Sequence, residues 1–336
     1  MTAGGWVLGV DSGGSGLRIA LAHAEDGRVV ETVSSGEPVP TGPAGIEAAA
    51  LLRQLLPAVE AMRLSAGAVD APAAVAIGAA GMATLGGELR AVLPGALKQA
   101  LGVRRLALAA DAVTAYAGAL GQRPGAVVAG GTGMIALGTD LVSWRRADGW
   151  GHLLGDCGGG AWIGRAGLEA AMRAHDGRRG GSGALLAAAE QRFGPVGGLP
   201  GALYPRTDRP AVLASFAPDV AGCAAEGDPV AADVLARAAA HIAEAAAAVC
   251  PTAGECEIAL TGRLFKLGDP LLVPLAGELA DQLPYARPVS AAEDPLGGAV
   301  AIAAALARGS LRLPRDPRLL HLGPPEVSGG SGSDTT

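Results

Sequence analysis

The chain has 336 residues, of which 50% are hydrophobic, and a formal net charge of −6. The length predicts two domains rather than one. Acidic and basic residues are interspersed, which argues against nucleic acid or an anionic membrane as a partner. We expect neither a signal peptide nor a membrane span, because no apolar run has the required length or flanks. The few, unevenly spaced cysteines predict reduced thiols in a cytoplasmic protein: Cys157, Cys223, Cys250 and Cys256.

The chain begins with a predicted hairpin of two apolar strands around a glycine turn. Residues 6–10 and 17–22 are apolar and flank the sequence DSGGSG, whose backbone N–H groups can face a ligand. Asp11 ends the first strand, where a carboxylate commonly holds a metal ion directly or through water. Aspartate and glycine also form ordinary tight turns, so this segment alone leaves both interpretations open.

The remainder of the first half alternates predicted strands and helices. In order they are a strand, a helix and two short strands, at 29–34, 46–64, 73–77 and 104–110. The last strand stops at Asp111, and a helical pattern follows to about Leu120. An aspartate at this junction is commonly a helix N-cap, which is the alternative to a catalytic role.

A second glycine hairpin, GAVVAGGTGMIALG at residues 125–138, repeats the opening pattern. The repeat predicts two similar halves, with a hinge in GQRPG at 121–125. We therefore expect domains at 1–120 and 121–325. A disordered tail is expected at 326–336, which has almost no apolar residue to bury. The remainder of the second domain is predicted to be mostly helical, with a strand at 257–260 and helices at 229–249, 270–283 and 295–308.

The segment GWGHLLGDCGGGAWIG, residues 149–164, is too rich in glycine for the interior of a helix or strand. It predicts a loop that comes close to a ligand. Its carboxylate, Asp156, would repel phosphate, so a phosphate cradle is a poor interpretation of this loop.

The motifs leave phosphoryl transfer as the best-supported chemistry. Neither lysine stands in a P-loop, and no GxGxxG links a strand to a helix. Glycine turns with backbone donors, a carboxylate for Mg²⁺ and a second carboxylate for the accepting hydroxyl are the parts that phosphoryl transfer needs. The residues alone therefore predict a nucleotide phosphate site.

These motifs, in this order, resemble the BadF/BadG/BcrA/BcrD ATPase family, and within it the N-acetylglucosamine kinases. They are DSGGSG, the strand-end Asp111, GGTG, GWGHLLGDCGGGAWIG, TGRLF and DPLGGA. The resemblance implies the actin-like sugar-kinase fold: two α/β domains, each with a five-stranded sheet of ribonuclease H type, that enclose ATP and sugar. It also implies a homodimer.

The resemblance implies a role for each matching residue. Asp111 would be the catalytic base, and Asp11 would act on Mg²⁺ through water. The β- and γ-phosphates of ATP would be bound by Gly13, Gly14, Ser15, Gly131, Thr132 and Gly133, and the adenosine by Gly262. Contacts to the sugar would come from Asp111, Gly149, Trp150 and Asp156.

Departures from the family pattern leave the substrate open. Cys157 and Gly159 stand where members mostly carry glutamate and often serine, and the chain contains no asparagine. Lost donors and acceptors in a polar sugar pocket change specificity strongly. N-acetylglucosamine is the first expectation, with glucosamine and N-acetylmuramic acid as alternatives. Two other classes also remain, an activator ATPase of 2-hydroxyacyl-CoA dehydratases and a non-catalytic sugar sensor.

Overall fold

The computed structural model describes residues 5–13, 16–37, 39–42, 45–252 and 256–323. The chain divides into two compact units. Unit 1 contains the residues up to Gln122 and those from Glu293 onward, and unit 2 spans Arg123–Ala292. The boundary falls within GQRPG, but the expected range of 121–325 for the second domain needs correction at its end. The tail at 326–336 lies outside the described residues.

Unit 1 is built on a six-stranded sheet in the order β13-β7-β6-β1-β2-β3. β1, β2 and β3 form an antiparallel meander, β6 and β7 run parallel to β1, and β13 pairs antiparallel with β7. Their bounds are Trp6–Gly13, Gly16–His23, Val29–Ser35, Ala74–Ala79, Leu106–Ala110 and Leu320–Leu322. The expectation of five strands in this sheet is wrong, because β13 returns from the C-terminal region and pairs with the otherwise open edge of β7.

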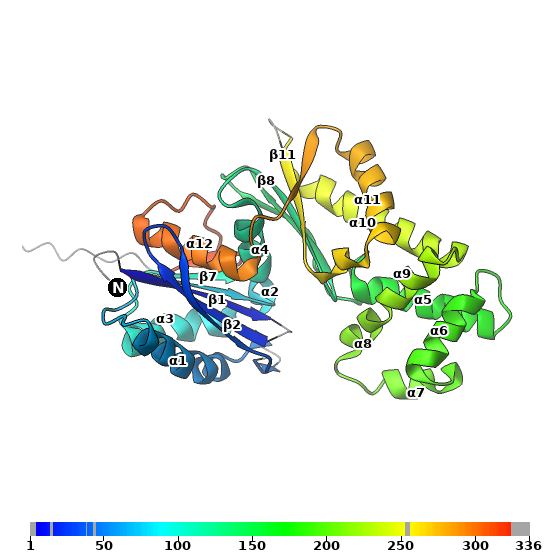
Figure 1. Ribbon diagram of the computed structural model, residues 1–336, viewed down its shortest axis with the longest axis horizontal. Coiled ribbons are helices and arrows are strands. Elements are labelled where there is room, and N and C mark those ends of the chain that lie inside the picture. Colours follow the sequence, from blue (N-terminus) through cyan, green and yellow to red (C-terminus); the bar gives the residue numbers. More distant parts are fainter. Residues whose placement is uncertain (1–4, 14–15, 38, 43–44, 253–255, 324–336) are drawn as a thin grey trace, which may run out of the picture. The chain divides into compact units, whose positions relative to one another are not determined.

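Helices cover both faces of this sheet (Figure 1). α1 (Ala48–Ser65) and α3 (Gly87–Leu101) lie on one face, and α4 (Asp111–Leu120) and α12 (Pro295–Arg308) on the other. A Cβ on Gly298 would lie 1.9 Å from the Thr114 carbonyl oxygen, so α4 and α12 meet at backbone distance. This contact, together with packing on β1 and β6, fixes α12 to unit 1 and explains the domain correction. Three short elements, α2, β4 and β5, occupy Met82–Leu85, Thr41–Gly42 and Gly45–Ile46.

Unit 2 contains a five-stranded sheet in the order β10-β9-β8-β11-β12. Its strands are Trp144–Asp148, Met134–Thr139, Gly125–Gly130, Cys256–Thr261 and Ala286–Ser290, in that order. The first three are antiparallel, and β11 and β12 run parallel to β8. This is the order and direction of β3-β2-β1-β6-β7 in unit 1, so the predicted repeat is confirmed at the level of topology. β10 was not predicted, because its sequence WRRAD is polar rather than apolar.

The helices of unit 2 surround α10 (Pro229–Val249), which packs against β8, β9 and β10. Asp228 caps this helix as expected, accepting a hydrogen bond from the Ala231 N–H at 2.8 Å. The other helices are α5, α6, α7, α8, α9 and α11, at Gly160–His175, Gly183–Phe193, Leu199–Leu203, Arg209–Ser215, Ala217–Ala225 and Asp269–Gln282. Single 3₁₀ turns lie at Val196–Gly198 and Arg263–Leu267. Within the described residues, no helix combines the length and apolarity that crossing a membrane requires.

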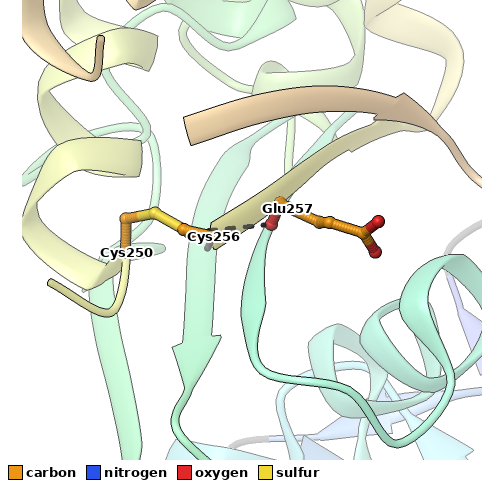
Figure 2. The surroundings of a disulfide bond; sticks show 3 residues. All are labelled: Cys250, Cys256 and Glu257. Carbon is orange, nitrogen blue, oxygen red and sulfur yellow. Dashed lines mark hydrogen bonds between the residues drawn. A yellow bond between two sulfur atoms is a disulfide. The ribbon is translucent and has the colours of Figure 1, made fainter. Parts of the chain in front are cut away.

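A disulfide joins Cys250, which follows α10, to Cys256, which begins β11 (Figure 2). The expectation of four reduced thiols is therefore wrong for this pair, while Cys157 and Cys223 are free. The end of α10 and the start of β11 bring the two Cα atoms to 6.6 Å, within bonding range for a disulfide. Because disulfides are rare in cytosolic proteins, the cysteines no longer support the cytoplasmic location, which stays a prediction.

Candidate active site

Asp11 and Asp111 lie at the same edge of the unit 1 sheet. β1, β6 and β7 are parallel, with Asp11 in register with Gly78 and Ala110 in register with Ala79. Asp111 follows Ala110 directly, so both aspartates stand at carboxyl ends of strands, about 10 Å apart by strand spacing. Ligands of open α/β sheets bind at this edge.

Asp111 is the first residue of α4 rather than its N-cap, which is Ala110. Its side chain is exposed, and its Oδ1 accepts a hydrogen bond from the Ala112 N–H at 2.9 Å. The capping interpretation therefore holds only in part, because the carboxylate sits in the first turn but does not end the helix. The positive end of the helix dipole favours negative charge at this position.

The carboxylate of Asp11 is paired with Arg18, its partner across the β1–β2 hairpin. Both Nε and Nη2 of Arg18 donate to Asp11 Oδ2, at 3.1 and 2.6 Å, and Nη1 donates to Asp294 Oδ2 at 2.5 Å. Asp294 is the N-cap of α12 and also accepts from the Gly297 N–H at 3.0 Å. A single guanidinium thus bridges two carboxylates at the turn of unit 1.

The guanidinium of Arg18 and the carboxylate of Asp294 have shifted pKa values. Burial disfavours the charged Arg18, but hydrogen bonds to Asp11 and Asp294 outweigh it and raise the pKa of the guanidinium. Burial would likewise raise the pKa of Asp294, yet the Gly297 N–H and Arg18 hold it below its usual value. The ionised forms of both groups are therefore stabilised in unit 1.

The donor set around Asp11 fits a magnesium ion. Mg²⁺ in phosphoryl-transfer sites usually takes one or two carboxylates and completes its shell with water and phosphate oxygens. Asp11 and Asp294 are two such carboxylates, and they already hold a cation, the guanidinium of Arg18. In the part of the chain that the structure describes, no cluster of three or more His, Cys, Asp or Glu side chains is placed to bind a metal by itself. The metal would thus need the nucleotide phosphates as further ligands.

In unit 2, the GTG turn and the predicted sugar loop are joined by backbone hydrogen bonds. The first N–H groups of α5 donate to the turn, Gly160 to the Gly131 oxygen at 2.9 Å and Ala161 to the Thr132 oxygen at 2.8 Å. Helix N-terminal N–H groups need such acceptors. The structure thus brings 131–133 and 149–164 together.

Asp156 stands directly against this turn. A Cβ built on Gly133 would lie 2.3 Å from Asp156 Oδ2, so only glycine leaves room for the carboxylate. Oδ1 accepts from the Gly151 N–H at 3.0 Å. Burial, reinforced by the nearby charge of Asp148, raises the pKa of Asp156. The carboxylate is therefore held beside the turn with one oxygen toward Gly133.

Gly149 and Trp150 belong to the same loop. Gly149 has a φ of 73°, and a Cβ there would meet Ile135 at 2.7 Å, so the position requires glycine. The Trp150 side chain is 62% exposed, with the Arg146 guanidinium 4.4 Å from its ring centroid. An exposed aromatic face beside a carboxylate is suited to stacking on a sugar ring.

The remaining predicted phosphate and adenosine residues fall into two kinds. Among the described residues, Gly13 and Gly131 have nothing within 4 Å of an added Cβ, so packing within this part of the chain does not explain their lack of a side chain. Gly262 has a φ of 103°, and a Cβ there would lie 2.0 Å from the Gly130 oxygen. The close approach of Gly262 to the end of β8 therefore requires glycine there, independently of its predicted role near adenosine. Gly14 and Ser15 lie outside the described residues.

Sequence reasoning assigned no role to four charged residues of these sites: Arg18, Arg146, Asp148 and Asp294. Arg18 was detectable by counting, since the pairing of Gly13 with Gly16 sets Arg18 opposite Asp11. Asp294 stands at a recognisable helix start, before Pro295. Asp148 carries no signal, because β10 itself was not predicted.

The repeated sheets, with glycine turns and aspartates at their strand ends, define an α/β protein of the actin-like sugar-kinase fold. The profile of the BadF/BadG/BcrA/BcrD ATPase family matches residues 8–280, and the chain belongs to this family. The predicted fold class and family are thereby confirmed.

Individual relatives agree with this assignment. A structure from Chromobacterium violaceum, regarded as an N-acetylglucosamine kinase, is 30% identical, with a TM-score of 0.66 over 88% of this chain and 98% of its own. An N-acetylmuramic acid/N-acetylglucosamine kinase of Clostridium acetobutylicum is 28% identical over 52% of this chain, which spans only 55% of that relative. A ROK family glucokinase from Streptomyces griseus, solved with glucose and AMPPNP, shares the fold at 22% identity, with a TM-score of 0.54 over 91% of this chain and 100% of its own.

Proposed function

We propose that the protein transfers the γ-phosphoryl group of ATP to an amino sugar, with N-acetylglucosamine 6-phosphate as the product from N-acetylglucosamine. The observation that carries this proposal is the position of Asp156, a half-buried carboxylate held against the glycine turn of unit 2. Phosphate and a carboxylate repel each other, so a carboxylate beside a phosphate turn calls for a hydroxyl-bearing substrate at the same place.

Each unit would supply part of the chemistry. In unit 1, Asp111 would accept or orient the proton of the sugar 6-hydroxyl, whose oxygen attacks the γ-phosphorus in line with the departing ADP. A carboxylate suffices, because the hydroxyl loses its proton late in a loose transition state. In unit 2, Asp156 would accept hydrogen bonds from sugar hydroxyls, with Gly149 and Trp150 beside it.

The nucleotide would be bound by the backbone of both glycine hairpins and by the segment at Gly262. Gly13 and Gly131 support this role, because none of the described residues has an atom within 4 Å of a Cβ added at either position. Asp11 would hold Mg²⁺ through water, and the ion would neutralise charge on the phosphates. The N–H groups at the turns would act as fixed donors to phosphate oxygens.

The sugar is chosen from the relatives. The two amino-sugar relatives act on, or are regarded as acting on, N-acetylglucosamine, and one of them also acts on N-acetylmuramic acid. Glucosamine and N-acetylmuramic acid remain the alternatives. A homodimer and a cytoplasmic location are further parts of the proposal, and the oligomer is testable by light scattering.

Coupled ADP release across a panel of sugars tests the proposed function. The panel contains N-acetylglucosamine, glucosamine, N-acetylmannosamine, N-acetylmuramic acid and glucose. We expect release that depends on sugar and is largest for N-acetylglucosamine. ADP release at the same rate with and without sugar would instead favour an activator ATPase. No ADP release with any sugar of the panel would favour a non-catalytic sugar sensor.

The variant Asp111→Asn tests the catalytic base. General-base catalysis contributes about 10²- to 10⁴-fold, so turnover should fall by that factor. ATP binding and the unfolding temperature should stay near the wild-type values, because Asp111 is exposed. Asp26→Asn is the control, since Asp26 is an exposed carboxylate that accepts a hydrogen bond from the Arg28 N–H. Unchanged turnover in Asp111→Asn would exclude the role.

A further inference from the structure

The carboxylate of Asp148, at the end of β10, is the centre of the loop that carries Asp156. Its Oδ1 accepts from the Asp156 N–H at 2.5 Å, and its Oδ2 from the Cys157 N–H at 2.8 Å. The Trp150 N–H also points at Oδ1, at 3.5 Å. A Cβ on Gly155 would lie 2.3 Å from the same oxygen, so the loop closes around this carboxylate.

The loop forms an anion-binding concavity that the protein fills itself. Asp156 has a φ of 55°, in the left-handed region, which turns its N–H and that of Cys157 toward one point. Successive N–H groups in this geometry bind anions. Asp148 supplies the anion, and this explains why the glycine-rich loop is not a phosphate cradle.

Asp148 is in turn fixed by its own strand. It pairs with Ile135 at the end of the β9–β10 ladder and has a φ of 59°. The Nε of Arg146 donates to the Asp148 carbonyl at 3.0 Å, and its Nη2 donates to the Gly149 carbonyl at 2.6 Å. The guanidinium also lies over Trp150. The loop is thus connected to the sheet through two charged side chains of β10.

We propose that Asp148 is a positioning residue for the sugar: its carboxylate binds the Asp156 and Cys157 amides and so holds the Asp156 side chain against the GTG turn. This proposal deepens the proposed function and rests on it for the identity of the ligand. Asp148 itself does not contact the sugar. Without these hydrogen bonds, the unfavourable left-handed backbone of Asp156 would lose the contacts that offset its cost.

Asp148 also affects the charge of Asp156. Burial raises the pKa of Asp156, the negative charge of Asp148 raises it further, and His152 and Arg146 oppose this. Replacing Asp148 by a neutral group lowers the pKa of Asp156, so the ionised form persists to lower pH. The acid limb of the pH profile of kcat/KM for the sugar should move to lower pH in such a variant.

The variant Asp148→Asn tests the proposal, because its amide group has the same shape but sets a donor against one of the two N–H groups. Hydrogen bonds to a charged group contribute enough that the KM for the sugar should rise about 10-fold or more. The KM for ATP should stay within about twofold, because the hydrogen bonds that Asp148 accepts come from Trp150, Asp156 and Cys157 rather than from the glycine turn at 131–133. The matched control is Asp140→Asn, on the same hairpin, where Oδ1 accepts from the Val142 and Ser143 N–H groups at 2.9 Å each. It should behave as the wild type.

A double-mutant cycle separates positioning from general damage. If Asp148 acts through Asp156, adding Asp148→Asn to Asp156→Asn should change the KM for the sugar by less than about twofold. A full additional 10-fold loss would overturn the proposal, since it would mean that Asp148 acts by another route. An unchanged KM in the single variant would overturn it as well.

Amide hydrogen exchange gives a readout that needs no sugar. In Asp148→Asn the amides of Asp156 and Cys157 should exchange faster by about 10-fold or more, while Asp140→Asn should leave them unchanged. If the sugar panel fails but exchange accelerates, the proposed function is wrong and the loop role of Asp148 stands. If the sugar panel succeeds while the exchange rates and the KM for the sugar are unchanged in Asp148→Asn, the proposed function stands and the positioning role of Asp148 is wrong.

Discussion

The two glycine hairpins occupy equivalent positions in the repeated sheets, yet they hold their carboxylates in different ways. In unit 1, Asp11 is paired with a side-chain cation, Arg18, that also binds Asp294. In unit 2, Asp148 and Asp156 accept hydrogen bonds from backbone N–H groups of their own loop. Side chains therefore neutralise the charge in unit 1, and the backbone does so in unit 2.

This difference suits different ligands. A guanidinium pair can be exchanged for another cation, such as a metal ion with its phosphates, at small cost because both partners are partly exposed. Backbone donors cannot be exchanged without moving the chain, so they give a fixed geometry. Fixed geometry is what discrimination among similar sugars requires. In the proposed function, unit 1 would thus bind the charged metal and phosphates, and unit 2 would recognise the shape of the sugar.

Among the changes that compare the two hairpins, the largest effect is expected from a single methyl group at the turn of unit 2. In Gly133→Ala, the added Cβ meets Asp156 Oδ2 at 2.3 Å and must displace it. We expect the KM for the sugar to rise about 10- to 100-fold, the cost of losing a charged hydrogen bond. Steady-state kinetics with varied sugar and ATP measure both constants.

Gly131→Ala is the matched control, two residues away in the same turn, where an added Cβ meets nothing within 4 Å. It should leave the KM for the sugar unchanged and raise the KM for ATP, because the methyl group points into space that a phosphate would use. If Gly133→Ala and Gly131→Ala changed the KM for the sugar and the KM for ATP equally, the proposed separation of sugar binding from phosphate binding within this turn would be wrong.

The sequence predicted the framework of both units better than their connections. The hairpins at Asp11 and at Gly131–Gly133 follow from apolar strands around glycine turns, which local pattern reveals. The pairing of β13 with β7 and the return of α12 to unit 1 depend on contacts between residues about 200 positions apart. Local patterns carry no information on such contacts.

The candidate site shows the same division. The motif predicted Asp156 as a sugar-binding residue. It did not predict Asp148, whose carboxylate holds the Asp156 loop, because Asp148 lies in the polar strand β10. The disulfide was missed for a related reason: the spacing of Cys250 and Cys256 does not reveal that α10 ends beside the start of β11. Residues that bind ligands recur in motifs, whereas residues that hold them in place depend on the fold.

The second prediction concerns the disulfide, which stabilises unit 2 from a position outside the candidate site. It lies at the start of β11, at the opposite end of the strand from Thr261, which Gly262 follows. Replacing both Cys250 and Cys256 by alanine should lower the stability by about 2 kcal/mol, as expected for a short disulfide loop. Thermal unfolding measures this change, and both KM values should remain within about twofold of the wild type.

Reductant provides the control for this variant. The wild type treated with tris(2-carboxyethyl)phosphine should unfold at a temperature close to that of the alanine variant, and the variant itself should not respond. If the reductant leaves the unfolding temperature of the wild type unchanged, and the thiols of Cys250 and Cys256 react freely with a thiol reagent before reduction, the disulfide is absent in solution.

The smallest effect is expected for Arg18→Gln, and its pH dependence distinguishes charge from shape. The variant loses the bridge between Asp11 and Asp294, at a cost of roughly 1 kcal/mol because the pair is partly exposed. Arg18 holds the pKa of Asp294 below its usual value, so the contribution of this pair is present at neutral pH. It is lost as the pH falls through the folded pKa of Asp294. The difference in Tm between wild type and variant should therefore be about 2–4 °C at pH 7 and shrink below about pH 4.

Arg63→Gln is the matched control in unit 1, since it breaks an exposed pair with Glu60. It should change Tm less at pH 7, and a difference for Arg18→Gln that persists undiminished in acid would mean that the guanidinium acts through packing rather than through its charge.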